Sequence, residues 1–97
     1  MPAMTYTVRW PDASETTAYS PSRVIREYFE PGRSYSLSEF LGLAREATGV
    51  ANQRVQAKFG FACSRASEQL DMLYAQARLH ADQPDARVEI VRFGPAD

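Results

Sequence analysis

Apolar and polar residues alternate at the start of the chain, as they do in a β-strand with one buried face. The apolar positions of this alternation are Met4, Tyr6, Val8 and Trp10. Residues 11–14 have the composition of a turn, and residues 15–19 return with β-prone Thr and Tyr, so the two segments predict a hairpin. Ala13 is a poor residue for any backbone position with positive φ, which leaves the turn type open.

A short amphipathic helix is predicted to follow the hairpin. Ser20 is the expected N-cap, and Pro21 is expected at the first helical position, where its missing N–H costs nothing. The apolar face of this helix consists of Val24, Ile25, Tyr28 and Phe29. The segment ends at Gly32, which gives a helix of about two and a half turns.

A long helix is predicted to begin at a capping box formed by Ser36 and Glu39. Its apolar stripe keeps the 3.6-residue period and consists of Phe40, Ala44, Ala47, Ala51 and Val55. We predict one helix of about 24 residues, and a break at Gly49 is the alternative. Gly60 stands where a left-handed residue ends a helix, and Phe61 is expected to fold back in a Schellman motif.

A third helix is predicted from Cys63 or Ser64 to His80, with two apolar stripes on different sides. The first stripe consists of Ala66, Leu70, Leu73 and Ala77, and the second consists of Met72, Ala75 and Leu79. One neighbour cannot cover both stripes. We therefore expect the chain to form a homodimer, because uncovered apolar stripes on a small protein usually mark a contact surface.

The last strand is predicted over residues 86–93. Val88 and Ile90 are expected on one face, and Val91 and Phe93 on the other. Apolar groups on both faces favour a central or interface position. The elements together predict one α+β domain over residues 1–97, in which a three-stranded antiparallel sheet packs against a long helical hairpin and one short helix.

Composition excludes several classes of protein. Eleven Lys and Arg against twelve Asp and Glu give a net charge of −1, which lacks the basic excess of a dedicated nucleic-acid binder. The single cysteine forms no internal disulfide, and with one histidine the chain has no zinc-binding cluster, so we expect no metal and no cofactor. No apolar run approaches the length of a membrane span, and a cytoplasmic location is expected.

Cys63 is the candidate catalytic residue. A cysteine at a helix N-terminus near Arg65 and Lys58 has its thiolate favoured by the helix dipole and by positive charge. Against this reading, no histidine lies close in the sequence to act as a base, and cysteine is often buried as a small apolar residue. The structural interpretation is favoured.

Five residues are candidates for binding an anion. Arg54 and Lys58 lie one helical turn apart, and Arg65 is expected to join them near the turn at Gly60. The hydroxyls of Ser20 and Ser22 lie at the expected start of the first helix. A solvated helix edge and an ordinary helix cap explain the same residues, and these structural readings are preferred.

Two further residues receive structural interpretations. His80 is expected to cap carbonyls or to interact with the dipole at the end of the third helix. Trp10 is expected in the core, because alternation along a strand is the usual pattern of packing and not of a nucleic-acid stacking platform.

Four segments resemble a small bacterial family of nitrogen-starvation response proteins. They are Trp10-Pro11-Asp12, Tyr19-Ser20-Pro21-Ser22, Pro31-Gly32, and the segment 54–63 with its Lys-Phe-Gly-Phe-Ala-Cys end. The resemblance covers most of the chain. Two departures are Ala13, where the family pattern has glycine, and Ala18, where some members have cysteine.

The resemblance implies a role in nitrogen or nitrile metabolism, because the family tends to be encoded beside a nitrilase. It supplies no established activity or catalytic residues. We predict a non-catalytic accessory or regulatory protein that acts through protein–protein interaction or by binding a small anionic ligand. The expected partners are proteins of nitrogen or nitrile metabolism. The alternative is a small thiol-dependent enzyme that uses Cys63 as nucleophile and Arg54 with Lys58 as the anion-binding groups.

Overall fold

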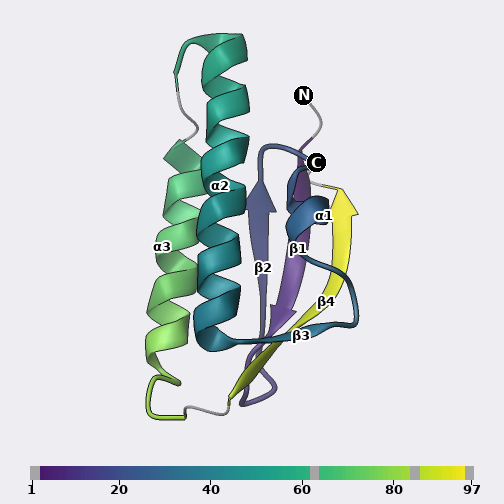
Figure 1. Ribbon diagram of the computed structural model, residues 1–97, viewed down its shortest axis with the longest axis vertical. Helices are drawn as coiled ribbons and strands as arrows, with labels where there is room; N and C mark the ends of the chain where they lie inside the picture. The colour runs from purple at the N-terminus through teal and green to yellow at the C-terminus, as the bar shows by residue number, and fades with distance from the viewer. Residues whose placement is uncertain (1–2, 62–63, 84–85, 96–97) are drawn as a thin grey trace.

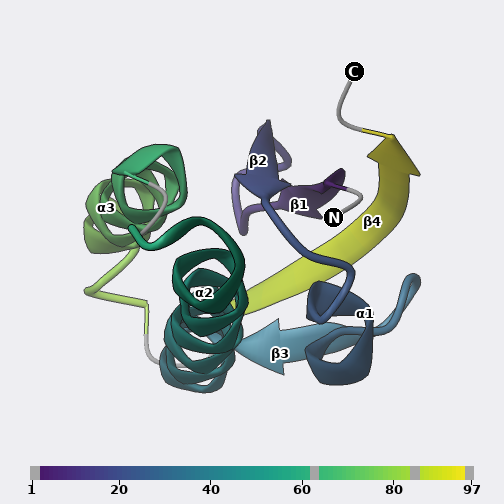
Figure 2. The same cartoon turned by 90° about the horizontal axis from the view of Figure 1, so that it is seen from above.

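Four strands form one antiparallel sheet, and the helices lie on one side of it (Figure 1, Figure 2). The computed structural model describes residues 3–61, 64–83 and 86–95. In chain order the elements are β1 (Met4–Arg9), β2 (Glu15–Ser20), α1 (Ile25–Tyr28), β3 (Ser34–Ser36), α2 (Leu37–Phe59), α3 (Ser64–Arg78) and β4 (Arg87–Pro95). The sheet order is β2-β1-β4-β3. The α+β class is therefore confirmed.

The fourth strand corrects the predicted three-stranded sheet. β3 is three residues long and pairs with β4, so that Tyr35 lies opposite Val88. Three residues are too few to display a period of two, which is why the strand left no pattern in the sequence. Its presence makes β4 an internal strand between β1 and β3, and this confirms the predicted central position.

A β-bulge in β4 corrects the predicted division of its apolar residues between two faces. Val8 pairs with Ile90 while Thr7 pairs with Arg92, so Val91 is the extra residue. The bulge shifts the alternation by one position, and Phe93 pairs with Tyr6. Phe93 consequently packs against the same core as Ile90.

α2 follows its predicted pattern closely. The Ser36 hydroxyl accepts a hydrogen bond of 3.2 Å from the Glu39 N–H, as an N-cap does. Its buried residues are the five of the predicted stripe, namely Phe40, Ala44, Ala47, Ala51 and Val55. The helix passes Gly49 without a break and ends at Phe59, before Gly60 with φ of 84°.

α1 is shorter than predicted and begins later. Ser20 is not its N-cap, because Ser20 is the last residue of β2 and pairs with Met4. Residues 21–24 form a turn, and the helix has only four residues. Ser20 is thus part of the sheet, and the helix starts only after the turn that follows it.

The core lies between the sheet and the helices and is rich in aromatic rings. The Phe29 ring, just after α1, lies 5.3 Å from the Phe40 ring of α2 and 5.4 Å from the Tyr35 ring of β3. The Tyr6 ring of β1 lies 5.9 Å from Phe29, and burial raises the pKa of the Tyr6 phenol. Trp10 is also buried in this core, as predicted.

The opposite face of the sheet is polar. Arg9 of β1 donates two hydrogen bonds to Glu15 of β2 and one to Glu89 of β4. The hydrogen bonds and the negative charge of Glu15, followed by the charge of Glu89, raise the pKa of the Arg9 guanidinium. Thr7 and Thr17 share a hydrogen bond across β1 and β2. This face is therefore polar and carries partly exposed ion pairs around Arg9, although Thr7 itself is buried.

The turn of the β1–β2 hairpin places Ala13 in the left-handed region. Its φ is 73°, and its N–H donates to the Trp10 carbonyl. The Asp12 carboxylate accepts hydrogen bonds from both the N–H and the hydroxyl of Ser14, which stabilises the turn. The same hydrogen bonds lower the pKa of the Asp12 carboxyl. An alanine at this φ is strained, and glycine is the residue that suits the position.

We expect Ala13→Gly to stabilise the fold. Relief of the left-handed strain stabilises the folded state by about 1–2 kcal/mol. The greater conformational entropy of glycine in the unfolded chain costs less, about 0.4–1 kcal/mol. The net gain of about 0.5–1 kcal/mol raises the melting temperature by a few degrees, which calorimetry measures. Ala57→Gly, at an exposed position of α2, is the matched control and should lower it. A lower melting temperature for Ala13→Gly would contradict the strain.

Candidate functional site

The corner, residues 58–61, joins the end of α2 to the start of the α2–α3 connection at one end of the molecule. Figure 1 shows this end of α2 projecting beyond the strands. The Gly60 N–H donates to the Gln56 carbonyl at 2.8 Å, which is the single-bond left-handed cap and not the expected Schellman motif. This cap reverses the chain without burying its flanking residues.

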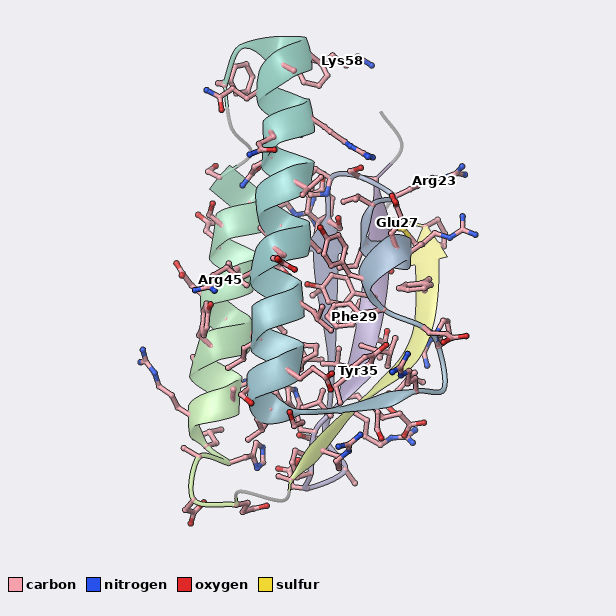
Figure 3. The ribbon with its side chains drawn as sticks, viewed as in Figure 1. Arg23, Glu27, Phe29, Tyr35, Arg45 and Lys58 are labelled. Carbon is pink, nitrogen blue, oxygen red and sulfur yellow. The ribbon has the colours of Figure 1, made fainter. Side chains whose placement is uncertain are left out.

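Two phenylalanines are exposed at the corner. Phe59 is 53% exposed and Phe61 is 65% exposed. Their ring centroids lie 6.4 Å apart, so the two rings form one apolar surface. The Lys58 ammonium lies 5.5 Å from the centroid of the Phe59 ring, and the labelled side chain reaches away from the helix (Figure 3). This surface was not predicted from the sequence, because the Schellman motif expected at Gly60 folds Phe61 back on the last turn of the helix.

Ser20 and Ser22 are buried in the turn between β2 and α1. The Ser20 hydroxyl donates to the Ser22 carbonyl at 2.8 Å and accepts from the Ser22 N–H at 3.4 Å. The Ser22 hydroxyl accepts from the Val24 N–H at 3.2 Å. Both hydroxyls therefore satisfy the backbone of this turn.

Arg54 reaches this turn from α2. Its Nη1 donates to the Ser22 hydroxyl oxygen at 3.3 Å, which brings together two of the predicted anion-binding residues. The side chain of Arg54 is otherwise exposed. The contact links α2 to the β2–α1 turn.

Lys58 and Arg65 do not join this pair. The Arg65 guanidinium carbon lies 4.1 Å from the centroid of the Tyr19 ring in β2, a close cation–π distance. Lys58 lies over Phe59 instead. The predicted anion-binding cations thus contact three different partners, and their role in ligand binding stays a prediction.

Cys63, the candidate nucleophile, lies outside the described residues, and its thiol chemistry also stays a prediction. Within residues 3–61, 64–83 and 86–95, no group of three or more His, Cys, Asp or Glu side chains is arranged to hold a metal ion. In those same residues no helix has the length and apolarity needed to cross a membrane.

His80 has a different environment from the predicted helix cap. It is 5% exposed, and its ring stacks on Trp10 at 6.1 Å with an interplanar angle of 14°. Its Nδ1 atom has no hydrogen-bond partner among the described residues. The buried ring therefore contributes to packing at the end of α3.

Two of the hollows on the described surface have well-defined linings, and none of the five predicted ligand-binding residues lines either of these two. One hollow, of about 450 Å³, lies beside α1 and the turn that follows it, with Phe29, Tyr35 and Phe93 in its lining. The other, of about 380 Å³, lies between the first turns of α2 and the last turns of α3. The predicted site and these two hollows are thus separate features.

Comparison with known proteins identifies the family. Residues 5–93 match the family described as "Nitrogen starvation-induced protein NitG". The chain belongs to this family. The match spans nearly the whole of the chain's 97 residues and includes the corner and the β2–α1 turn. No curated protein matches the sequence, and no solved structure matches it either.

Membership confirms the resemblance to nitrogen-starvation proteins, and the family's description supports a role related to nitrogen starvation. It assigns no mechanism to any residue of this chain. The exposed corner lies within the matched residues 5–93.

The hydrogen bonds of the β2–α1 turn predict a structural role for Ser22. Ser22→Ala leaves the buried Val24 N–H without its acceptor and should lower the free energy of unfolding by about 1–2 kcal/mol. Arg54→Gln removes only an exposed donor and should cost less than about 0.5 kcal/mol. Urea denaturation of both variants measures the difference. If Ser22→Ala were as stable as the parent chain, the structural role of Ser22 would be contradicted, and the predicted role in binding an anion would be favoured.

Proposed function

We propose that this chain is a non-catalytic accessory protein of the nitrogen-starvation response, and that it acts by docking its corner on a partner protein. Membership of the NitG family supports the physiological setting. The observation that carries the mode of action is the exposure of Phe59 and Phe61 side by side at a projecting end of the molecule.

Two exposed aromatic rings supply binding energy to a partner that covers them. Transfer of a phenylalanine side chain from water to an apolar environment is worth about 1.5–3 kcal/mol. Phe59 is 53% and Phe61 65% exposed, so burial of the remaining exposed surface of both rings offers about 2–3.5 kcal/mol, the scale of one interface hot spot. The polar outer face of the sheet, with the Arg9 ion pairs, offers no comparable apolar anchor.

The charges around the corner define the chemistry of the partner. No Asp or Glu occurs between Glu46 and Glu68, whereas Arg54, Lys58 and Arg65 lie in that segment. The corner therefore carries only positive charge beside its apolar rings. A complementary partner presents an apolar cleft for the two phenylalanines and acidic residues at the rim. Following the family resemblance, we expect that partner among proteins of nitrogen or nitrile metabolism.

The thiol-enzyme alternative has weaker support. That hypothesis needs Arg54 and Lys58 to hold one anionic substrate beside Cys63. Arg54 is hydrogen-bonded to Ser22, and Lys58 lies over Phe59. The two cations are thus directed to different groups, which does not favour a shared substrate pocket.

A photo-cross-linking amino acid at position 61 tests the docking in nitrogen-starved cells. We expect one major adduct, with a cross-linked peptide that carries acidic and apolar residues. Lys58→Glu should reduce this adduct about fivefold or more by charge repulsion, and an acidic-to-lysine change in the cross-linked peptide should restore it. Restoration by the second charge reversal identifies a specific interface, which capture alone does not.

The same cross-linker at position 45 is the matched control, because Arg45 is also exposed on α2 but lies far from the corner along that helix. Adducts of position 61 with lipid, or a yield unchanged by Lys58→Glu, would contradict the docking. An adduct between two copies of this chain would instead support the predicted homodimer. The homodimer remains a proposal, supported by the exposed Leu79 and Ala75 of the second apolar stripe.

Growth recovery of a nitrogen-starved deletion strain distinguishes docking from thiol chemistry. We expect Cys63→Ser to support recovery as well as the parent chain, whereas Phe59→Ser combined with Phe61→Ser should fail. Both phenylalanines are exposed, so the double variant should keep the melting temperature of the parent. Loss of recovery in Cys63→Ser, together with full recovery in the double variant, would favour the enzyme.

A further inference from the structure

We propose that the hollow between the first turns of α2 and the last turns of α3 binds a small organic monoanion with an apolar body. This hollow lies at the end of the helical hairpin opposite the corner, where α2 begins and α3 ends (Figure 1). It has a volume of about 380 Å³. The site is separate from the proposed docking surface and does not depend on it.

The walls of the hollow are mainly apolar. Leu37 and Leu41 contribute from successive turns of α2 and are both half-buried. Ala77 and the ring of Tyr74 contribute from α3, and Ala77 is buried. Surfaces of this kind take up the hydrocarbon part of a ligand and leave a few polar groups to fix its orientation.

The charge of the lining selects an anion. The residues that line the hollow include Arg78 and no Asp or Glu. Within residues 3–61, 64–83 and 86–95, Arg78 forms no ion pair within 4.0 Å. Its guanidinium is therefore available to bind a carboxylate through two parallel hydrogen bonds. The Ser38 hydroxyl, also in the lining, adds a neutral donor.

The volume limits the size of the ligand. A volume of about 380 Å³ lies at the lower end of the range of small-molecule pockets, which is about 300–1,000 Å³. That space suits a molecule of about ten non-hydrogen atoms. A single arginine matches a single negative charge, so the favoured class is a medium-chain or aryl monocarboxylate and not a di- or triphosphate.

Octanoate is a suitable probe, because it has the expected size and charge, and octanamide is its uncharged isostere. We expect titration with octanoate, followed by two-dimensional amide NMR of the full chain, to shift the signals of Leu37, Leu41, Tyr74 and Ala77. Octanamide should bind about tenfold more weakly, because it lacks the charge that pairs with Arg78. Inorganic phosphate should leave these signals unchanged, because it has no apolar body.

Arg78→Gln tests the role of the cation, and Arg45→Gln is its matched control. Arg45 is an exposed arginine of α2 that does not line the hollow, and its side chain is labelled in Figure 3. We expect Arg78→Gln to weaken octanoate binding about tenfold and to leave octanamide binding unchanged. Arg45→Gln should change neither. The melting temperature of each variant verifies its fold.

Several results would overturn the proposal. One is the absence of saturable octanoate shifts up to about 10 mM, a concentration well above a millimolar dissociation constant. Another is equal affinity for octanoate and octanamide, or an equal effect of Arg78→Gln and Arg45→Gln. Shifts centred on Arg54 and Ser22 instead of the hollow would also overturn it, and would place the anion at the β2–α1 turn.

Discussion

The packing of Phe29 is the contact on which the arrangement of this fold depends. Its ring contacts Tyr6 of β1, Tyr35 of β3 and Phe40 of α2, with centroid distances of 5.3–5.9 Å. Phe29 itself is 2% exposed and directly follows α1. The Phe29 side chain, at the end of α1, thus contacts α2 and both strands that flank β4. The Tyr35 hydroxyl also accepts from the Glu30 N–H, which holds the chain after Phe29 in place.

The position of α2 over this cluster explains why the corner is exposed. A helix of 23 residues spans about 35 Å, whereas the six-residue strands β1 and β2 span about 20 Å and the nine-residue β4 spans about 30 Å. Phe40 fixes the start of α2 over the sheet, so the far end must extend beyond the strands. The last buried residue of α2 is Val55, and all residues from 56 to 61 are exposed. The exposure of Phe59 and Phe61 therefore follows from a mismatch in length.

The sequence was sufficient where one local rule decided the structure. The stripe of α2 and its cap at Ser36 depend on periodicity and on hydrogen bonds within a few residues, and both were predicted correctly. The features that were missed depend on partners distant in sequence. β3 exists because β4 pairs with it, and the face of Phe93 depends on a bulge set against β1.

The candidate site was less predictable than the fold for the same reason. Helical spacing placed Arg54 and Lys58 one turn apart, but it does not show what each side chain contacts. The partner of Arg54 comes from residue 22, and the partner of Arg65 is the ring of Tyr19. Ser22 lies in the β2–α1 turn and Tyr19 lies in β2, so both contacts depend on how the helices pack against the sheet. The charge pattern therefore predicted which residues are candidates, but it did not predict which groups their side chains contact.

The two proposed surfaces lie at opposite ends of one helical hairpin, and this separation makes their contributions distinguishable. Leu41 and Phe59 are 18 residues apart on α2, which corresponds to about 27 Å. Free-energy changes at sites separated by more than about 10 Å usually add when the sites share no contacts. A carboxylate in the hollow would influence the corner only by moving α2 as a body. The packing of Phe40 against Phe29 and Trp10 opposes such a movement, so the fold favours two independent binding events.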